Sequence, residues 1–299
     1  MKTFDLKSYL KKQRAIIDAA LKKWLPMEDG PSKPVFDAMQ YSLMAGGKRV
    51  RPIIFLAGAE AVGADMAGLL PFACAIECIH TYSLIHDDLP AMDNDDLRRG
   101  RPTCHKVFGE AVAILAGDGL LTYAFELMTN QALIGHISSE SVLRAVSIIS
   151  KAAGVFGMVG GQTADILMEG RDIDSKTLDF IHRHKTGALI QASVETGGFL
   201  GKGTQEEIRQ LKRYGMALGL IFQIIDDILD VEGDKTLMGK PIGSDAKKKK
   251  ATYPALFGVD EARHSVVFLL NNALSCLEAF DEKAEPLRAM AQYVVERDR

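Results

Sequence analysis

Apolar residues recur along this chain at the spacing of an α-helix. In the stretch GMALGLIFQIIDDILDV, Leu218, Ile221, Ile225 and Leu229 follow one another at steps of three and four residues. That spacing places them on one helical face. The strict alternation of apolar and polar residues that indicates a half-buried strand is scarce. The pattern therefore predicts an all-α protein.

Glycine and proline divide this helical pattern into pieces. Thr204-Gln-Glu-Glu207 has the form of a capping box, and it directly follows the glycine break at 201–203. Further breaks lie at 26–34, 63–65, 100–102, 135, 170–175, 233–243 and 258. Roughly ten or more helices fit between them, and no shift in composition marks a second domain. We expect one all-α domain over residues 1–299, a large helix bundle.

Composition narrows the class of protein. Lys+Arg 36 against Asp+Glu 39 leaves a net charge of -3, so no overall basic field favours nucleic acid. No uncharged apolar run reaches the ~18 residues of a membrane span. Four cysteines form no disulfide framework in a chain of 299 residues, which predicts a cytoplasmic protein. A zinc site at Cys74, Cys78 and His80 would need a fourth ligand, and one apolar helix accounts for both thiols.

A first acidic cluster lies in LIHDDLPAMDNDDLRRG, where five aspartates occupy ten positions behind an apolar helical run. Carboxylates at the C-terminal end of a helix repel one another and face the negative end of its dipole. Pro90 disfavours helix at Leu89, so we expect the helix to end there and the segment carrying Asp93 to fold back. A solvated acidic loop is the alternative interpretation of DNDD alone.

A second acidic cluster, IIDDILD, lies inside an apolar helical pattern. Asp226 and Asp230 are four residues apart and share one face, with Asp227 beside them. Grouped carboxylates without thiolates suit hard cations, and Mg²⁺ takes one or two of them beside water and substrate phosphates. The two clusters together therefore indicate a metal-bridged diphosphate site at facing helix ends.

Basic residues complete this pattern. GGKRVRP places Lys48, Arg49 and Arg51 after a glycine pair and before a proline, which is a plausible phosphate clamp. Other isolated cations follow the acidic clusters or lie between them: Arg98, Arg99, Lys185 in HKTGALI and Lys240 in GKPIG. Metal ions would neutralise one diphosphate while side-chain cations hold another.

Together these motifs resemble the trans-prenyltransferases, the family of farnesyl and geranylgeranyl diphosphate synthases. The resemblance covers nearly the whole chain in the family's order, from GGKRVRP through DDLPAMD, GGQTADI, HKTGALI and IIDDILD to GKPIGSDAKKKKATYP. The longer DDLPAMD form is typical, among enzymes making short products, of bacterial farnesyl and of bacterial and plant geranylgeranyl synthases.

The resemblance implies head-to-tail condensation of isopentenyl diphosphate with an allylic diphosphate, by a homodimer with the isoprenoid synthase fold and three Mg²⁺ ions, Mn²⁺ being an alternative. The implied metal ligands are Asp87 and Asp93 in the first cluster and Asp226 as main ligand in the second, completed by Asp88, Asp227 and Asp230. Arg98 is implied for the allylic diphosphate, and Lys48, Arg51, His80 and Arg99 for isopentenyl diphosphate. Lys185, Thr186, Gln223 and Lys240 are implied around the reacting centre.

The chemistry agrees with these residue types. Ionisation of the allylic carbon–oxygen bond needs stabilisation of a departing diphosphate, which is electrostatic catalysis by metal and cations. The Thr186 hydroxyl and the Gln223 amide would shield the carbocation in a cavity that excludes water. The departed diphosphate can take the final proton. Asp118, Gln162 and Asp165 fit either active-site lining or internal hydrogen bonding, and the role of Lys247–Lys250 stays open.

Product length depends on the residues beneath the first acidic cluster. Tyr82 lies five residues before Asp87 with Ser83 beside it. In the farnesyl synthases that this chain resembles, a bulky aromatic residue at that position limits the cavity, so the resemblance implies the fifteen-carbon farnesyl product rather than the twenty-carbon geranylgeranyl product. A terpene cyclase would need neither GGKRVRP nor a second aspartate motif. A non-catalytic partner subunit is expected to have lost site residues, and a di-iron bundle would need Glu-x-x-His pairs.

Overall fold

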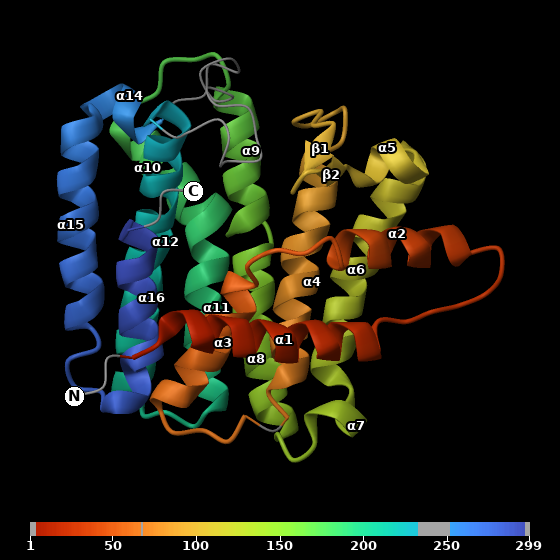
Figure 1. The fold of residues 1–299 in the computed structure, drawn as a ribbon, viewed down its shortest axis with the longest axis horizontal. Helices are drawn as coiled ribbons and strands as arrows, with labels where there is room; N and C mark the ends of the chain where they lie inside the picture. Colours follow the sequence, from red (N-terminus) through yellow and green to blue (C-terminus); the bar gives the residue numbers. More distant parts are fainter. Residues whose placement is uncertain (1–3, 67, 233–251, 297–299) are drawn as a thin grey trace. The chain divides into compact units, whose positions relative to one another are not determined.

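A computed structural model of the protein describes residues 4–66, 68–232 and 252–296 (Figure 1). Helices make up 75% of the structure, as the helical spacing predicted. Its only strands are β1 (Leu97–Arg98) and β2 (Arg101–Pro102), which pair antiparallel with Arg98 opposite Arg101. The all-α prediction is therefore confirmed.

The chain divides into two compact units. Unit 1 comprises Met1–Leu6, Ile54–Met66 and Leu143–Arg299, and unit 2 comprises Lys7–Ile53 and Ala67–Val142. Two of the boundaries fall inside helices α3 (Val50–Ala61) and α8 (Ser139–Ala153). The single domain expected over residues 1–299 stays a prediction.

Unit 2 is built around α4. Its helices are α1 (Leu6–Trp24), α2 (Lys33–Leu43), α4 (Leu70–Asp87), α5 (Cys104–Phe108), α6 (Glu110–Thr129) and α7 (Gln131–Ile134). Helix α4 packs along α6 and also contacts α2, and most of its residues are buried. A helix that is apolar on every side belongs in the centre of a core. Phe72, Ile76 and Ile79 are fully buried, so α4 carries the first acidic cluster on a rigid support.

Unit 1 is built around the long helix α12 (Gln205–Glu232). Its other elements are α9 (Met158–Met168), α10 (Ser175–Ile181), the π-helix η1 (His182–Gly187), α11 (Ala188–Leu200), α14 (Tyr253–Phe257), α15 (Val259–Ser275), the 3₁₀ turn η2 (Glu282–Ala284) and α16 (Glu285–Glu296). Helix α12 packs against α11, α15, α16 and η1. The fully buried Tyr214 fixes it to α16 by donating its hydroxyl to the carbonyl of Leu287 over 2.7 Å.

The capping box predicted at Thr204 is present. The amide of Thr204 donates to Oε2 of Glu207 over 2.6 Å, and the amide of Glu207 donates to Oγ1 of Thr204 over 3.2 Å. These reciprocal bonds satisfy amides that have no partner within the helix. They fix the start of α12, and therefore the register in which it presents IIDDILD.

Two helices pass the length and composition test for a membrane span, Glu110–Thr129 and the stretch Ser139–Met168. The expectation that the chain has no membrane span was based on uncharged apolar runs alone. These two helices contain up to two charged residues in an 18-residue window. Core helices of water-soluble proteins pass the same test, so two such helices are weak evidence for a membrane protein.

Candidate active site

The first acidic cluster forms a turn at the end of α4. The helix ends at Asp87, and the amide of Asp93 donates to the carbonyl oxygen of Asp87 over 2.8 Å. The amide of Asn94 donates to the carbonyl of Leu89 over 3.1 Å, and Asn94 itself has φ +52. The segment therefore folds back, as Pro90 predicts, and Asp87 and Asp93 meet at one backbone hydrogen bond.

Asp88, the next residue, is bound to Arg98. The Arg98 Nε lies 2.7 and 2.8 Å from the two carboxylate oxygens of Asp88, which is only 3% exposed. Burial alone would lower the pKa of Arg98, but the hydrogen bonds and charge of Asp88 raise it. The hairpin β1–β2 thus presents a permanently charged guanidinium beside the aspartate turn. The metal role of Asp88 and the diphosphate role of Arg98 stay predictions.

The basic motif separates into one buried cation and two cations that are more exposed. Arg49 is 2% exposed, and its Nη1 donates to Oε1 of Glu77 over 2.6 Å. Lys48, in contrast, is exposed and Arg51 is partly exposed. Sequence reasoning grouped Arg49 with the phosphate clamp, but the structure turns its side chain into the interior of unit 2.

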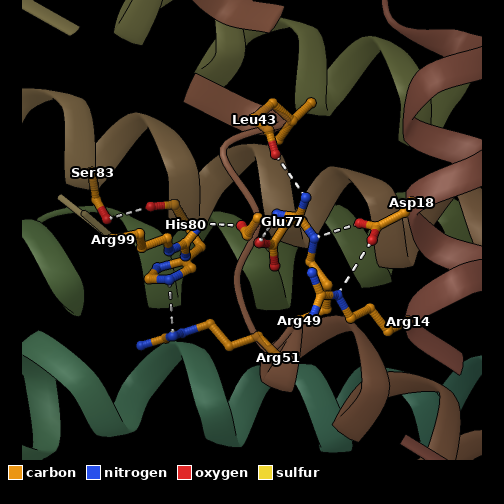
Figure 2. Close-up of polar contacts among 10 residues, drawn as sticks. Arg14, Asp18, Leu43, Arg49, Arg51, Glu77, His80, Ser83 and Arg99 are labelled. Atoms are coloured by element: carbon orange, nitrogen blue, oxygen red, sulfur yellow. Dashed lines mark hydrogen bonds and ion pairs between the residues drawn. The ribbon is translucent and has the colours of Figure 1, made fainter. Parts of the chain in front are cut away.

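Arg51, His80 and Arg99, all predicted for the isopentenyl diphosphate pocket, gather around this loop (Figure 2). Nη1 of Arg51 lies 3.4 Å from Nε2 of His80, and Arg99 donates to the carbonyl of Gly46. Gly47 has φ +123, and a Cβ there would lie 2.6 Å from the Arg99 guanidinium carbon. The φ of Gly47 favours glycine, whereas the flexible end of the Arg99 side chain could shift to relieve such a contact.

His80 is held neutral. Burial and then the charges of Arg51, Arg99, Arg98 and Arg49 lower the pKa of the imidazole well below its usual value. A neutral ring accepts a hydrogen bond at one nitrogen, so Nε2 can accept from Arg51. The local field around His80 is consequently positive, which suits a diphosphate.

In unit 1 a π-helix carries Lys185 and Thr186. π-Helical turns are rare and frequent at functional sites. The Thr186 hydroxyl donates to Oε1 of Gln223 over 2.9 Å, and Lys185 Nζ donates to Asp165 over 2.6 Å. A Cβ at Gly219 would lie 2.6 Å from the Cα of Gly187, so α12 approaches η1 closely enough for that contact.

The second acidic cluster divides between surface and interior. Asp226 is exposed and Asp230 partly exposed, whereas Asp227 is 3% exposed. Asp227 accepts hydrogen bonds from Gln223 Nε2 over 3.0 Å and from the amide of Tyr253 over 2.8 Å. The role of Asp227 as a metal ligand stays a prediction, and its contacts fix Gln223 and the start of α14.

His182 lies beside this buried carboxylate. Its Nε2 is 3.4 Å from Oδ2 of Asp227, and burial lowers the pKa of the imidazole to about 4. The ring is therefore neutral near pH 7 and packs as an uncharged group. Nothing in the sequence pattern singled it out.

Several other predicted residues have defined surroundings. Tyr82 is 7% exposed with its ring edge-on to His86 at 5.8 Å, and the Ser83 hydroxyl donates within its own helix to His80. Asp118 lies 3.9 Å from His86. The ion pair with Lys185 shows that Asp165 takes part in internal bonding. Lys240 and Lys247–Lys250 lie outside the described residues.

The carboxylates suit magnesium by their chemistry. Within the described residues, no three His, Cys, Asp or Glu side chains are close enough to form a metal cage. Mg²⁺ is usually bound by one or two carboxylates, with phosphate oxygens and water filling the other positions. Carboxylates with this donor chemistry occur in both clusters. Asp87 and Asp93 lie at one turn in unit 2, and the exposed Asp226 lies one helical turn before Asp230 in unit 1.

Comparison with known proteins identifies the family of this chain. A polyprenyl synthetase family model matches residues 32–291. The chain is 48% identical over 303 residues to the farnesyl diphosphate synthase of Geobacillus stearothermophilus, covering 100% of both. It is 47% identical to the dimethylallyltranstransferase of Fischerella ambigua, covering 99% of this chain and 84% of that one. It is 44% identical to the geranylgeranyl diphosphate synthase of Cyanophora paradoxa, covering 99% and 97%.

Solved structures share the fold. The apo structure of a FPP/GFPP synthase from Zymomonas mobilis matches with a TM-score of 0.87 at 36% identity, covering 97% of this chain and 98% of that one. The geranylgeranyl pyrophosphate synthetase from Pyrococcus horikoshii matches with a TM-score of 0.88 at 32% identity, covering 98% of each chain.

Proposed function

This chain belongs to the polyprenyl synthetase family, and from that premise we propose that it condenses isopentenyl diphosphate with dimethylallyl and geranyl diphosphates to give farnesyl diphosphate. It is a prenyltransferase. The observation that carries the proposal is the aspartate turn at Asp87 and Asp93 in the same unit as the group formed by Arg51, His80 and Arg99. A one-substrate diphosphate enzyme needs no such second cationic group.

The metal-binding residues in this proposal are Asp87, Asp93 and Asp226 for three Mg²⁺ ions, with Asp88, Asp227 and Asp230 completing the two clusters; Mn²⁺ is the alternative. Bound metal would supply charge neutralisation for the diphosphate leaving group. Asp88 also holds Arg98 in place for that leaving group, because its carboxylate accepts hydrogen bonds from both Nε and Nη2 of the forked guanidinium.

The remaining residues bind the two diphosphates and shield the carbocation from water. Lys48, Arg51, His80 and Arg99 hold the diphosphate of isopentenyl diphosphate, and Lys185 and Lys240 stabilise the leaving diphosphate. The Thr186–Gln223 pair supplies fixed dipoles at the allylic carbon while excluding water. The hydrogen bond between Gln223 and Asp227 holds that amide in one orientation. The proton released in the last step goes to the departed diphosphate.

The fifteen-carbon product is proposed from Tyr82. Its buried ring lies on α4 about 7.5 Å from the level of Asp87, given a rise of ~1.5 Å per residue. A prenyl tail anchored at the aspartates and growing along α4 would meet that ring. The geranylgeranyl product is the alternative, since a geranylgeranyl diphosphate synthase is 44% identical over nearly the same length.

The proposed assembly is a cytoplasmic homodimer. Apolar side chains are exposed in each unit: Ile114 at 45% and Leu115 at 53% on α6 of unit 2, and Val155 at 70% and Phe156 at 82% in the turn between α8 and α9 of unit 1. Exposed apolar groups of this kind favour association with a second copy.

A diphosphate-release assay tests the reaction class. The purified protein should release inorganic diphosphate only when isopentenyl diphosphate, an allylic diphosphate and Mg²⁺ are all present. Release from the allylic diphosphate alone would indicate a cyclase or hydrolase, and no release under any condition would indicate a non-catalytic subunit.

A further inference from the structure

Arg49 joins the basic loop to three helices of unit 2 (Figure 2). Its Nη1 donates to Glu77 of α4, its Nε donates to Asp18 of α1 over 2.8 Å, and its Nη2 donates to the carbonyl of Leu43 at the end of α2 over 2.7 Å. Each contact uses a different nitrogen of the fork. The guanidinium is therefore held in one position from three directions.

The buried ion pair between Arg49 and Glu77 is not well suited to stabilising the fold. The side chains of Arg49 and Glu77 are each 1% exposed, so both charges have lost their water. Burying two charges has a large desolvation cost that their attraction offsets only with good geometry, and apolar replacements of similar size are often as stable. Among the described residues, Oε2 of Glu77 has no hydrogen-bond partner. A role other than stability explains the pair better.

The backbone at Arg49 has an uncommon conformation. Arg49 has φ +51, the left-handed region that residues with a side chain seldom adopt. Strained positions of this kind persist where surrounding contacts determine them. The Arg49 side chain is directed inward, Lys48 before it is exposed, and Arg51 after it lies in the first turn of α3.

Helix α4 holds both arginines of the motif. Glu77 and His80 are three residues apart and therefore lie on the same side of the helix. Glu77 binds Arg49, and His80 lies 3.4 Å from Arg51. The carboxylate binds the buried Arg49, and the imidazole lies beside Arg51. Helix α4 therefore gives the two arginines of the loop different neighbours.

We propose that Arg49, held by Glu77, is a positioning residue for the homoallylic substrate: it sets the loop geometry that lets Lys48 and Arg51 grip the isopentenyl diphosphate, without touching that substrate. The proposal rests on the proposed function and deepens it. It predicts that a folded variant without the Arg49–Glu77 pair binds isopentenyl diphosphate more weakly, while its binding of the allylic substrate is nearly unchanged.

The test replaces the pair by the apolar double variant Arg49→Met/Glu77→Met, which leaves no buried charge unpaired. Steady-state kinetics should show the Michaelis constant for isopentenyl diphosphate raised about tenfold or more, with that for geranyl diphosphate within about twofold. Arg49→Lys, which keeps the charge but loses the fork, should fall between the double variant and wild type. The matched control Arg14→Ala removes only an exposed contact to Asp18 at 3.4 Å and should resemble wild type.

Two outcomes in a folded double variant would overturn the proposal. These are an unchanged Michaelis constant for isopentenyl diphosphate and an equal rise for both substrates. Wild-type protein is assayed alongside, and absence of turnover there would contradict the proposed function rather than the role of Arg49. If the double variant precipitates, Arg49→Lys alone must still show the selective rise.

Discussion

The amide of Asp93 lies 2.8 Å from the carbonyl oxygen of Asp87, so two aspartates six residues apart meet at one turn. On a continuous helix they would point about 120° apart. The turn begins where α4 ends, directly before Leu89 and Pro90. The six-residue spacing therefore fits a folded-back loop, and both carboxylates belong to the magnesium site that we propose.

Loss of either aspartate cluster should remove most turnover. We expect Asp87→Ala and Asp226→Ala each to lower kcat by about a hundredfold or more, because each removes charge neutralisation of the leaving group. The control Asp172→Ala changes an exposed aspartate outside both clusters and should leave kcat unaltered. Measurement of kcat over a Mg²⁺ titration checks this, and near-normal turnover in both cluster variants would refute the metal assignment.

Lys48 and Arg51 of the basic motif should contribute mainly to the binding of one substrate, isopentenyl diphosphate. Lys48→Ala and Arg51→Ala should raise the Michaelis constant for isopentenyl diphosphate about tenfold, with a smaller effect on the allylic substrate, because each loses a charged contact to one diphosphate. Lys33→Ala, which removes an exposed lysine paired with Asp37, is the control. Equal rises for both substrates would mean that the two diphosphates do not have separate pockets.

Tyr82→Ala should lengthen the product from fifteen to twenty carbons or beyond. The change opens the path of the tail and leaves the aspartates and arginines in place, at an expected loss of order 3 kcal/mol in folding free energy. Assays are therefore run at low temperature, with Tyr82→Phe as the control that keeps the ring and the fifteen-carbon product. An unchanged farnesol peak after dephosphorylation, from folded Tyr82→Ala, would exclude Tyr82 as the stop.

His80 should make stability depend on pH. Burial and then Arg51, Arg99, Arg98 and Arg49 keep the pKa of His80 well below its usual value in the folded protein, whereas the unfolded chain protonates near 6.5. As the pH falls through about 6.5 the unfolded state alone binds this proton, so the free energy of unfolding decreases. Urea unfolding at pH 7.5 and 5.5 should show a smaller decrease for His80→Gln. An equal decrease in both proteins would contradict the assignment.

The fold was largely predictable because its signals are local. Apolar spacing predicted helices, Pro90 predicted the end of α4, and the Thr204–Glu207 box predicted the start of α12. Each of these depends on residues within a few positions of one another, where sequence spacing and spatial contact coincide.

The site was less predictable because its contacts join residues far apart in the chain. Arg49 meets Glu77 and Asp18 across about thirty residues, and Asp227 meets Tyr253 across a similar gap. Nothing near Arg49 in the sequence distinguishes it from Arg51. The π-helix at His182–Gly187 has no spacing signal of its own. In each case a contact between distant residues decides the role of a side chain.

The length of the prenyl chain tests the central claim most directly. Purified protein is incubated with labelled isopentenyl diphosphate, dimethylallyl diphosphate and Mg²⁺, and the products are dephosphorylated and separated by chromatography. Farnesol is predicted as the main alcohol, with geraniol at early times and no product when chelator removes the metal. Label that stays in isopentenyl diphosphate would contradict prenyl transfer, and geranylgeraniol as the main alcohol would contradict the fifteen-carbon product.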